Sequence, residues 1–141
     1  MILNIRTLDD LEWASDYCHD ALFETDKAVY DKTSKMFLLP LVREMWEKAE
    51  IAKRKWIFQW WKIPKTQSIL LFHNVIDISI KFNQPDDILT GIDYDDENKA
   101  ILIKGMKGST FRLDVDVISG KLEDKGDIYH DGGRILTINK K

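Results

Sequence analysis

The sequence predicts an α+β protein with an antiparallel sheet of about six to eight strands and an N-terminal helix packed on it. Two observations predict this class. Apolar residues near the N-terminus recur at helical spacing, and apolar and polar residues alternate at 76–82 and 110–118. A chain of 141 residues has the length of one domain. We expect that domain over 1–130, followed by a C-terminal tail over 131–141 in which RILTIN can add an edge strand.

A short strand and a helix are predicted at the N-terminus. ILNIR, at 2–6, has the composition of a strand, and an oxygen of Thr7 or Asp9 can cap the helix that follows. Apolar residues then recur every three to four positions, so we expect the helix at roughly 8–20. These positions are Leu8, Leu11, Ala14 or Ser15, Cys18 and Leu22.

The next segment is predicted to form a hairpin. Its first strand covers 21–30, its turn-rich connection covers 31–35, and its second strand covers 36–42. Pro40 cannot donate a hydrogen bond to a neighbouring strand. The second strand is therefore expected at an edge of the sheet, or bulged at Pro40.

Residues 43–62 allow two interpretations. REMWEKAEIAKRK, at 43–55, consists almost entirely of good helix formers. The aromatic residues of 56–62 favour a strand preceded by a loop. We expect a short helix followed by an extended segment.

The second half of the chain predicts an antiparallel meander. Residues 68–82 form one long β-type run, and turns rich in Asp, Asn and Gly separate the later strands. These later strands are expected at 88–94, 99–104, 110–118 and 121–123, with turns at 95–98 and 105–108.

Four segments of strand and turn carry a resemblance to a known family. They are CHDALF, TDKAVYDKTSKMFLLPLVREMWE, LLFHNVIDI and GSTFRLDVDVISGKLED, and they cover about residues 3–127. The chain resembles a family of small, uncharacterised bacterial proteins whose domain has no known function. The resemblance therefore implies no catalytic residues. The tryptophan-rich segment 56–61 departs from the family pattern, in which a polar linker is expected.

The composition predicts a folded protein in a reducing compartment. The chain is 44% apolar and 32% charged, with a net charge of −3 and one cysteine. A single cysteine cannot form an intramolecular disulfide, and the apolar runs are too short for a signal peptide or a membrane span. We expect a cytoplasmic protein that does not associate with membranes.

No motif predicts catalysis. Cys18 could act as a nucleophile only beside a base such as His73. DYDDEN, at 93–98, lacks the glycine and glutamate of a calcium loop, and GMKGS, at 105–109, precedes no helix that would complete a phosphate site. We expect no catalytic residue, no metal and no cofactor, and we favour a protein that is not an enzyme.

The stretch KRKWIFQWWKIPK, at 53–65, is the candidate binding site. It holds three of the five tryptophans and five basic residues. Burial in the core and exposure in a protein interface are both open. The candidate partner-binding residues are Lys53, Arg54, Lys55, Trp56, Trp60, Trp61 and Lys62.

From this stretch we expect a non-catalytic interaction or structural protein, with a protein partner or self-association, the simplest form being a homodimer. The alternative is a module that binds single-stranded nucleic acid or another ligand through 53–65, since aromatic rings stack on bases and lysines neutralise phosphates. The six acidic residues of 83–98 would repel a polyanion and disfavour nucleic acid.

Overall fold

The computed structural model describes residues 1–48, 50–55, 58–125, 129–130 and 135–138, with side chains for 1–48 and 63–125. Within these residues the fold is α+β, with antiparallel pairing throughout, and the predicted class is confirmed. The described strands form one sheet of eleven and a second sheet of three, which is more than the predicted six to eight.

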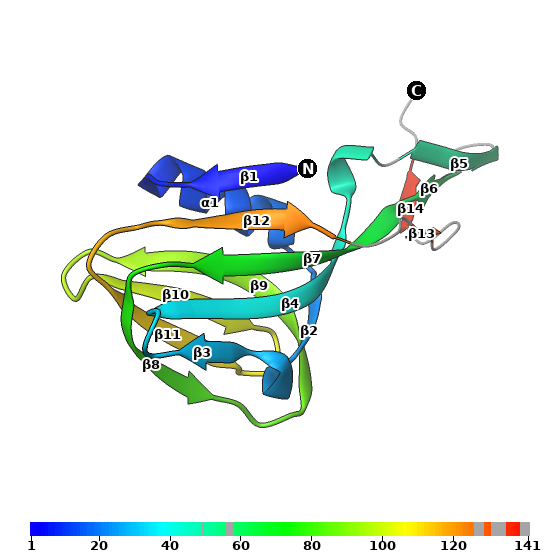
Figure 1. Cartoon of the computed structure of the whole chain (residues 1–141). Helices are drawn as coiled ribbons and strands as arrows, with labels where there is room; N and C mark the ends of the chain where they lie inside the picture. Colours follow the sequence, from blue (N-terminus) through cyan, green and yellow to red (C-terminus); the bar gives the residue numbers. More distant parts are fainter. Residues whose placement is uncertain (49, 56–57, 126–128, 131–134, 139–141) are drawn as a thin grey trace.

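The larger sheet runs in the order β1-β12-β7-β4-β2-β9-β10-β11-β8, with β3 paired to β4 and β13 paired to β7. Figure 1 shows this sheet as the main body of the molecule. Its strands are β1 (Ile2–Ile5), β2 (Leu22–Glu24), β3 (Val29–Asp31), β4 (Met36–Glu44), β7 (Pro64–Phe72), β8 (Val75–Lys81), β9 (Asp86–Asp95), β10 (Ala100–Gly105), β11 (Thr110–Val115), β12 (Gly120–Asp124) and β13 (Tyr129–His130).

The smaller sheet, which we call the arm, consists of β5 (Glu50–Lys55), β6 (Phe58–Lys62) and β14 (Ile135–Ile138). Its order is β14-β6-β5, so the C-terminal strand pairs with β6. The arm projects from the body where β4 ends and β7 begins (Figure 1). A single 3-10 turn, η2 (Trp46–Lys48), connects β4 to β5.

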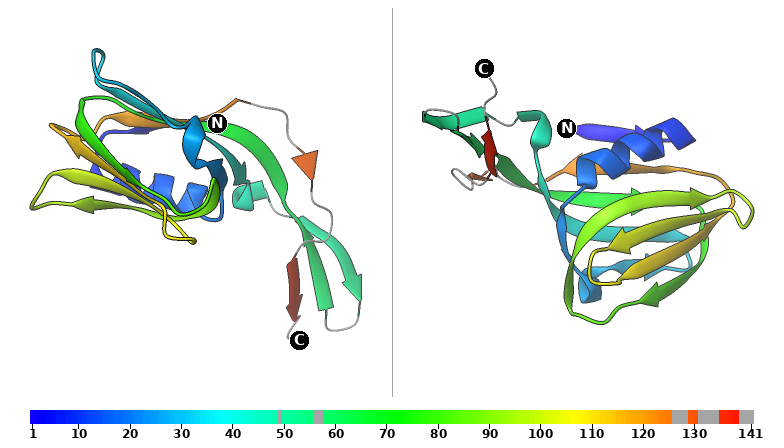
Figure 2. Two further views of the ribbon diagram at one scale, coloured as in Figure 1. Left: turned by 90° about the horizontal axis from the view of Figure 1, so that it is seen from below. Right: turned by 180° about the vertical axis from the view of Figure 1, so that it is seen from behind.

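The larger sheet bends into two layers that enclose the core (Figure 2). One layer contains β1, β12, β7, β4 and β3, and the other contains β9, β10, β11 and β8. Phe111 of the second layer contacts the rings of Phe23 and Phe37, each at 5.7 Å between centroids. All three rings are buried, so they join the two layers across the centre.

Helix α1 (Leu8–Cys18) covers the core beside β9 and β1. The capping prediction is confirmed at Thr7, whose hydroxyl accepts a hydrogen bond from the backbone N–H of Asp10, while the Asp10 carboxylate accepts one from the N–H of Thr7. The hydroxyl of Ser15 accepts from the N–H of Ile92 at 2.9 Å and so attaches the helix to β9. The helix side chains buried in the core are Leu11, Ala14 and Cys18.

The predicted single strand over 21–30 is wrong, because the chain forms β2, the 3-10 turn η1 (Thr25–Lys27) and β3 in this interval. The cause is Thr25, which is buried and bonds to the connection before β9. Its backbone N–H and its hydroxyl donate to the carbonyl of Pro85 at 2.9 and 3.1 Å. These bonds draw the chain inward between β2 and β3.

The predicted long run over 68–82 is divided into β7 and β8 by a turn at His73 and Asn74. Asn74 has a φ of 58°, a left-handed conformation that asparagine tolerates well. After the turn, β8 leaves β7 and pairs with β11 in the other layer. The long β-type run therefore crosses from one layer to the other.

The predicted helix at 43–55 is also wrong. β4 continues to Glu44, and after η2 the chain is the strand β5. Helix propensity is a weak preference, and the tertiary contacts of Arg43 and Glu47 described below outweigh it. The rival prediction of a strand in 56–62 agrees with β6, which begins at Phe58.

Candidate functional site

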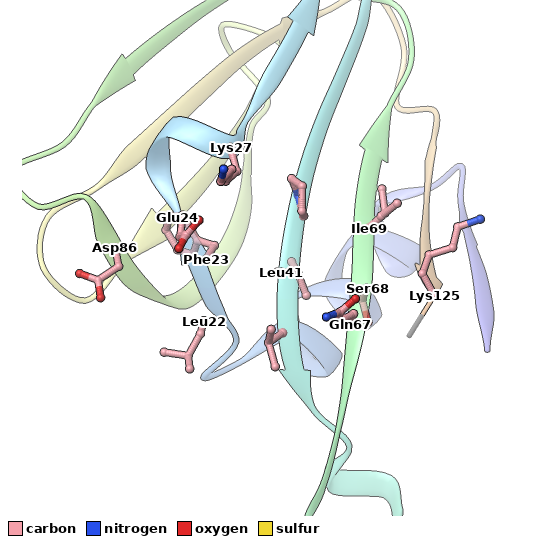
Figure 3. A pocket seen from close by; sticks show the side chains of 12 residues that line it. Leu22, Phe23, Glu24, Lys27, Leu41, Gln67, Ser68, Ile69, Asp86 and Lys125 are labelled. Atoms are coloured by element: carbon pink, nitrogen blue, oxygen red, sulfur yellow. The ribbon is translucent and has the colours of Figure 1, made fainter. Parts of the chain in front are cut away.

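A groove opens on the outer face of the larger sheet where β2 and β4 separate (Figure 3). The two strands pair only at Leu22 and Val42, after which β2 follows β9. On β4, the pairing with β3 ends at Leu38. Pro40 lies between the pairing of β4 with β3 and the pairing of β4 with β2. Proline has no backbone N–H, so β4 has no hydrogen-bond donor at this position. The gap around Pro40 becomes a groove of about 610 Å³.

The floor of the groove is apolar and its rim is charged. Phe23 and Leu41, both buried core residues, form its depth. The remaining apolar lining is contributed by Leu22, Pro40, Val42 and Ile69, and the polar lining by Glu24, Lys27, Gln67, Ser68, Asp86 and Lys125. The rim thus contains two carboxylates and two ammonium groups around an apolar surface, which is the pattern of a binding site.

A buried arginine lies at the junction of the body and the arm. Arg43 has no exposed surface, and its guanidinium bonds two carboxylates. Nε and Nη2 donate to Asp124 at 2.9 and 3.0 Å, while Nη1 and Nη2 donate to Glu47 at 3.0 and 2.7 Å. The Ser68 hydroxyl also donates to Asp124 at 2.6 Å, and the Tyr17 ring lies 5.5 Å from the guanidinium carbon. We call these residues the Arg43 cluster.

The Arg43 cluster holds both segments of chain that leave the body. Glu47 belongs to η2, which leads from β4 to the arm, and Asp124 ends β12, after which the chain continues to β13 and β14. Bidentate arginine–carboxylate contacts are strong and fix geometry as well as charge. We infer that this cluster sets the position at which the arm starts.

The Arg43 cluster also shifts the titration of its carboxyl groups. Burial alone would raise the pKa of Asp124 and of Glu47. The hydrogen bonds and the charge of Arg43 nevertheless hold both pKa values below the ordinary 3.8 and 4.5. Both carboxylates therefore stay ionised at neutral pH and balance the buried guanidinium.

We expect this titration to appear in the acid stability of the protein. A carboxyl with a lowered pKa stabilises the fold above its ordinary value, and this contribution disappears as the pH falls through the lowered value. Asp124→Asn should therefore lower the free energy of unfolding at pH 7. Below pH 3.8, the free energy of unfolding of this variant should fall less steeply with decreasing pH than that of the unmodified protein. The two slopes should differ by at most about 1.4 kcal/mol per pH unit.

Urea unfolding at a series of pH values measures this slope. Asp93→Asn is the matched control, since Asp93 is an exposed partner of Lys104 on the surface of β9. An unchanged slope in Asp124→Asn, or an equal change in Asp93→Asn, would contradict the assignment.

Cys18 is fully buried in the core, close enough to Arg43 for its charge to affect the thiol. Burial raises the pKa of its thiol to about 12, an effect that the charge of Arg43 reduces but does not cancel. A nucleophilic cysteine needs an accessible thiolate. This thiol is therefore a small apolar group of the core.

The glycine-containing turn GMKGS is a hairpin turn between β10 and β11, as predicted. Its backbone N–H groups do not face solvent, because the buried carboxylate of Asp87 accepts from Lys107 and Ser109 at 2.8 and 3.1 Å. Gly105 is needed here, since a Cβ at this position would overlap that carboxylate. These two N–H groups are therefore bonded within the protein and are not available to a phosphate.

Six of the seven predicted partner-binding residues map to the arm. Lys53, Arg54 and Lys55 lie on β5, whereas Trp60, Trp61 and Lys62 lie on β6; Trp56 lies outside the described residues. In the register, Trp60 is opposite Lys53 on one side and Leu136 of β14 on the other. The backbone therefore brings these residues into one small sheet, away from the groove.

The comparison with family models agrees with the resemblance seen in the sequence. A model described as "Protein of unknown function (DUF2948)" matches residues 3–133. The chain belongs to the DUF2948 family. The predicted resemblance to an uncharacterised family is thereby confirmed. No curated protein and no solved structure gives a significant match to this DUF2948 chain.

Two features of this DUF2948 protein were missed by sequence reasoning: the groove and the Arg43 cluster. One signal could have indicated the cluster, because Arg43 continues the alternation of Phe37, Leu39 and Leu41, which are all buried. An arginine at an inward position requires carboxylate partners. Nothing comparable marks the groove, which is formed by strands distant in the sequence.

Among the helices that the structure describes, none is long and apolar enough to cross a membrane. The same residues contain no group of three or more histidine, cysteine or acidic side chains placed to hold a metal ion.

Proposed function

We propose that this protein is a non-catalytic binding protein whose groove between β2, β4 and β7 holds an apolar segment of another protein. The observation that carries this proposal is the accessible apolar lining of the groove, in which Leu22 is 46% exposed and Pro40, Val42 and Ile69 are half-buried. Apolar surface that a folded chain leaves uncovered and rimmed by polar residues is typical of an interaction site.

The rim supports a polypeptide as the occupant. Glu24 and Asp86 lie with Lys27 on the side of β2 and β9, which is therefore acidic by one charge, whereas Lys125 lies beyond β7 on the opposite side (Figure 3). Charges of opposite sign across an apolar floor favour one orientation of a bound segment that itself carries both charges. The cytoplasmic location expected from the single cysteine is part of the same proposal.

A photoreactive amino acid at position 67 tests the proposal directly. Gln67 is exposed and lines the groove beside Val42, so its replacement leaves the core intact. We expect irradiation in cells to give a discrete protein adduct from position 67. The same photoreactive group at Glu97, in the exposed turn after β9, should give none.

A second substitution tests whether the apolar floor binds the partner. Ile69→Lys places a charge on the floor of the groove, and we expect the adduct from position 67 to disappear while the thermal unfolding midpoint stays within a few degrees. Adducts that persist in Ile69→Lys, or that form equally at position 97, would reject the groove as the binding site.

The use of 53–65 for single-stranded nucleic acid or another ligand stays a prediction of the sequence. Its test is the binding of a single-stranded oligonucleotide at low salt, which should weaken steeply as salt increases.

A further inference from the structure

Strand β8 forms one end of the larger sheet. The hairpin of β3 and β4 covers the outer edge at the start of β8, because the N–H of Val75 donates to the carbonyl of Lys35 at 2.9 Å and the Tyr30 hydroxyl donates to the carbonyl of Val75 at 2.8 Å. From Asp77 to Lys81, the outer edge faces no other strand among the residues that the structure describes. Figure 1 shows it at the lower side of the body. The N–H of Ile78 donates to the carboxylate of Asp77 at 2.9 Å, so the backbone of Ile78 is directed away from β11. By the two-residue period of a strand, the backbone of Ile80 has the same direction. An edge whose backbone groups are not bonded to a neighbouring strand can pair with another strand, and the Asp77 carboxylate then exchanges the N–H of Ile78 for a new partner.

The side chains on the inner face of this edge are apolar and incompletely covered. Ile78 is opposite the buried Leu113 and packs against the core, and Ile80 is opposite the buried Phe111. Ile80 is nevertheless 38% exposed, and Phe82, the next residue on this face, is 54% exposed. A neighbouring strand at this edge would cover both side chains.

The outer face of β8 carries two opposite charges at equal distances from Ser79. Asp77 lies two positions before Ser79, and Lys81 lies two positions after it. In the pairing with β11, Asp77 is opposite Asp114, a residue of the same charge. Neither Asp77 nor Lys81 forms an ion pair within the described part of the chain.

We propose that β8 pairs antiparallel with β8 of a second copy of this chain, about a two-fold axis at Ser79. In this register Asp77 of each copy is opposite Lys81 of the other, and Ile78 is opposite Ile80. The apolar side chains then meet on one face and the opposite charges on the other. The backbone groups of Ile78 and Ile80, which point away from β11, form the hydrogen bonds between the copies.

Registers that differ by two residues use the same backbone groups for pairing. The charges of Asp77 and Lys81 favour one of these registers. A shift by two residues in one direction places Asp77 opposite Ser79, and a shift in the other direction places it opposite Asn83. Only the register centred on Ser79 pairs Asp77 with Lys81. This surface shares no residue with the groove, so the dimer is independent of the proposed function.

Sedimentation equilibrium of the full-length chain, from micromolar to millimolar concentration, tests the proposal. We expect the mass to double with concentration. Asp77→Lys and Lys81→Asp each place like charges opposite one another, and each should raise the dissociation constant about tenfold or more. An equimolar mixture of the two variants should restore the dimer, because each position is then opposite a residue of the other sign.

Glu97→Lys is the matched control for the change in net charge, and it should leave the dissociation constant unchanged. Circular dichroism should show the same fold in every variant. A chain that is monomeric over the whole range would overturn the proposal. So would a dimer that the single substitutions do not weaken, or a mixture that dissociates as the single variants do, since the contact would then lie elsewhere, as on the arm.

Discussion

Arg43→Met is expected to lower the free energy of unfolding by about 3–5 kcal/mol. The substitution keeps much of the side-chain volume. It removes the guanidinium, which bonds to both Asp124 and Glu47. The side chain of Asp124 is only 9% exposed, so its carboxylate is left in a poorly solvated site, where the Met1 ammonium at 3.5 Å is the charged partner that remains among the described residues. Chemical denaturation at pH 7 measures the loss.

Two controls separate the buried charge from the lost side chain. Arg112→Met breaks an ion pair with Asp114 whose partners are 39% and 40% exposed, and it should change the stability by less than about 1 kcal/mol. The triple variant Arg43→Met, Asp124→Asn, Glu47→Gln removes both carboxylates with the guanidinium, and should be more stable than Arg43→Met alone. If the triple variant were the less stable of the two, the explanation by unpaired buried charge would be wrong.

Phe111→Ala should also cost about 3–5 kcal/mol, for a different reason. The ring has no exposed surface and contacts both Phe23 and Phe37, so its removal leaves a cavity between the two layers of the sheet. The cavity cannot collapse easily, because the layers are also held apart by the neighbouring core residues Leu113 and Leu39.

Phe82→Ala is the matched control, since that ring is 54% exposed at the end of β8. At a protein concentration too low for dimers, Phe82→Ala should change the free energy of unfolding by no more than about 0.5 kcal/mol. Thermal unfolding followed by circular dichroism compares the two variants. A loss in Phe111→Ala of similar size to that in Phe82→Ala would show that the layers are not joined through Phe111.

The elements that could be predicted from the sequence are those with local causes. Thr7 and Asp10 cap α1 within a single turn, and the spacing of Leu11 and Cys18 defines its buried face. The turn at 95–98 is likewise local, because Asp95 accepts hydrogen bonds from the two backbone N–H groups at its end. In such segments the neighbouring residues are sufficient to specify the conformation.

The segments that could not be predicted depend on distant partners. Residues 43–55 have helical composition, yet Arg43 bonds to Asp124, which is 81 positions away. The groove likewise needs β2, β4 and β7 to be placed side by side, with Pro40 at the point where β4 changes neighbours. The order of the strands in the sheet cannot be predicted from the pattern of neighbouring residues in the sequence.

The pairing of β1 with β12 has a consequence for synthesis on the ribosome. Ile2 is opposite Glu123, so β1 finds its partner only after the strands between them have been translated. The hairpins formed by β9, β10 and β11 join close neighbours and are ready to form earlier. Until β12 arrives, β1 has a free edge on the nascent chain, and chaperones that shield exposed strands would act during this interval.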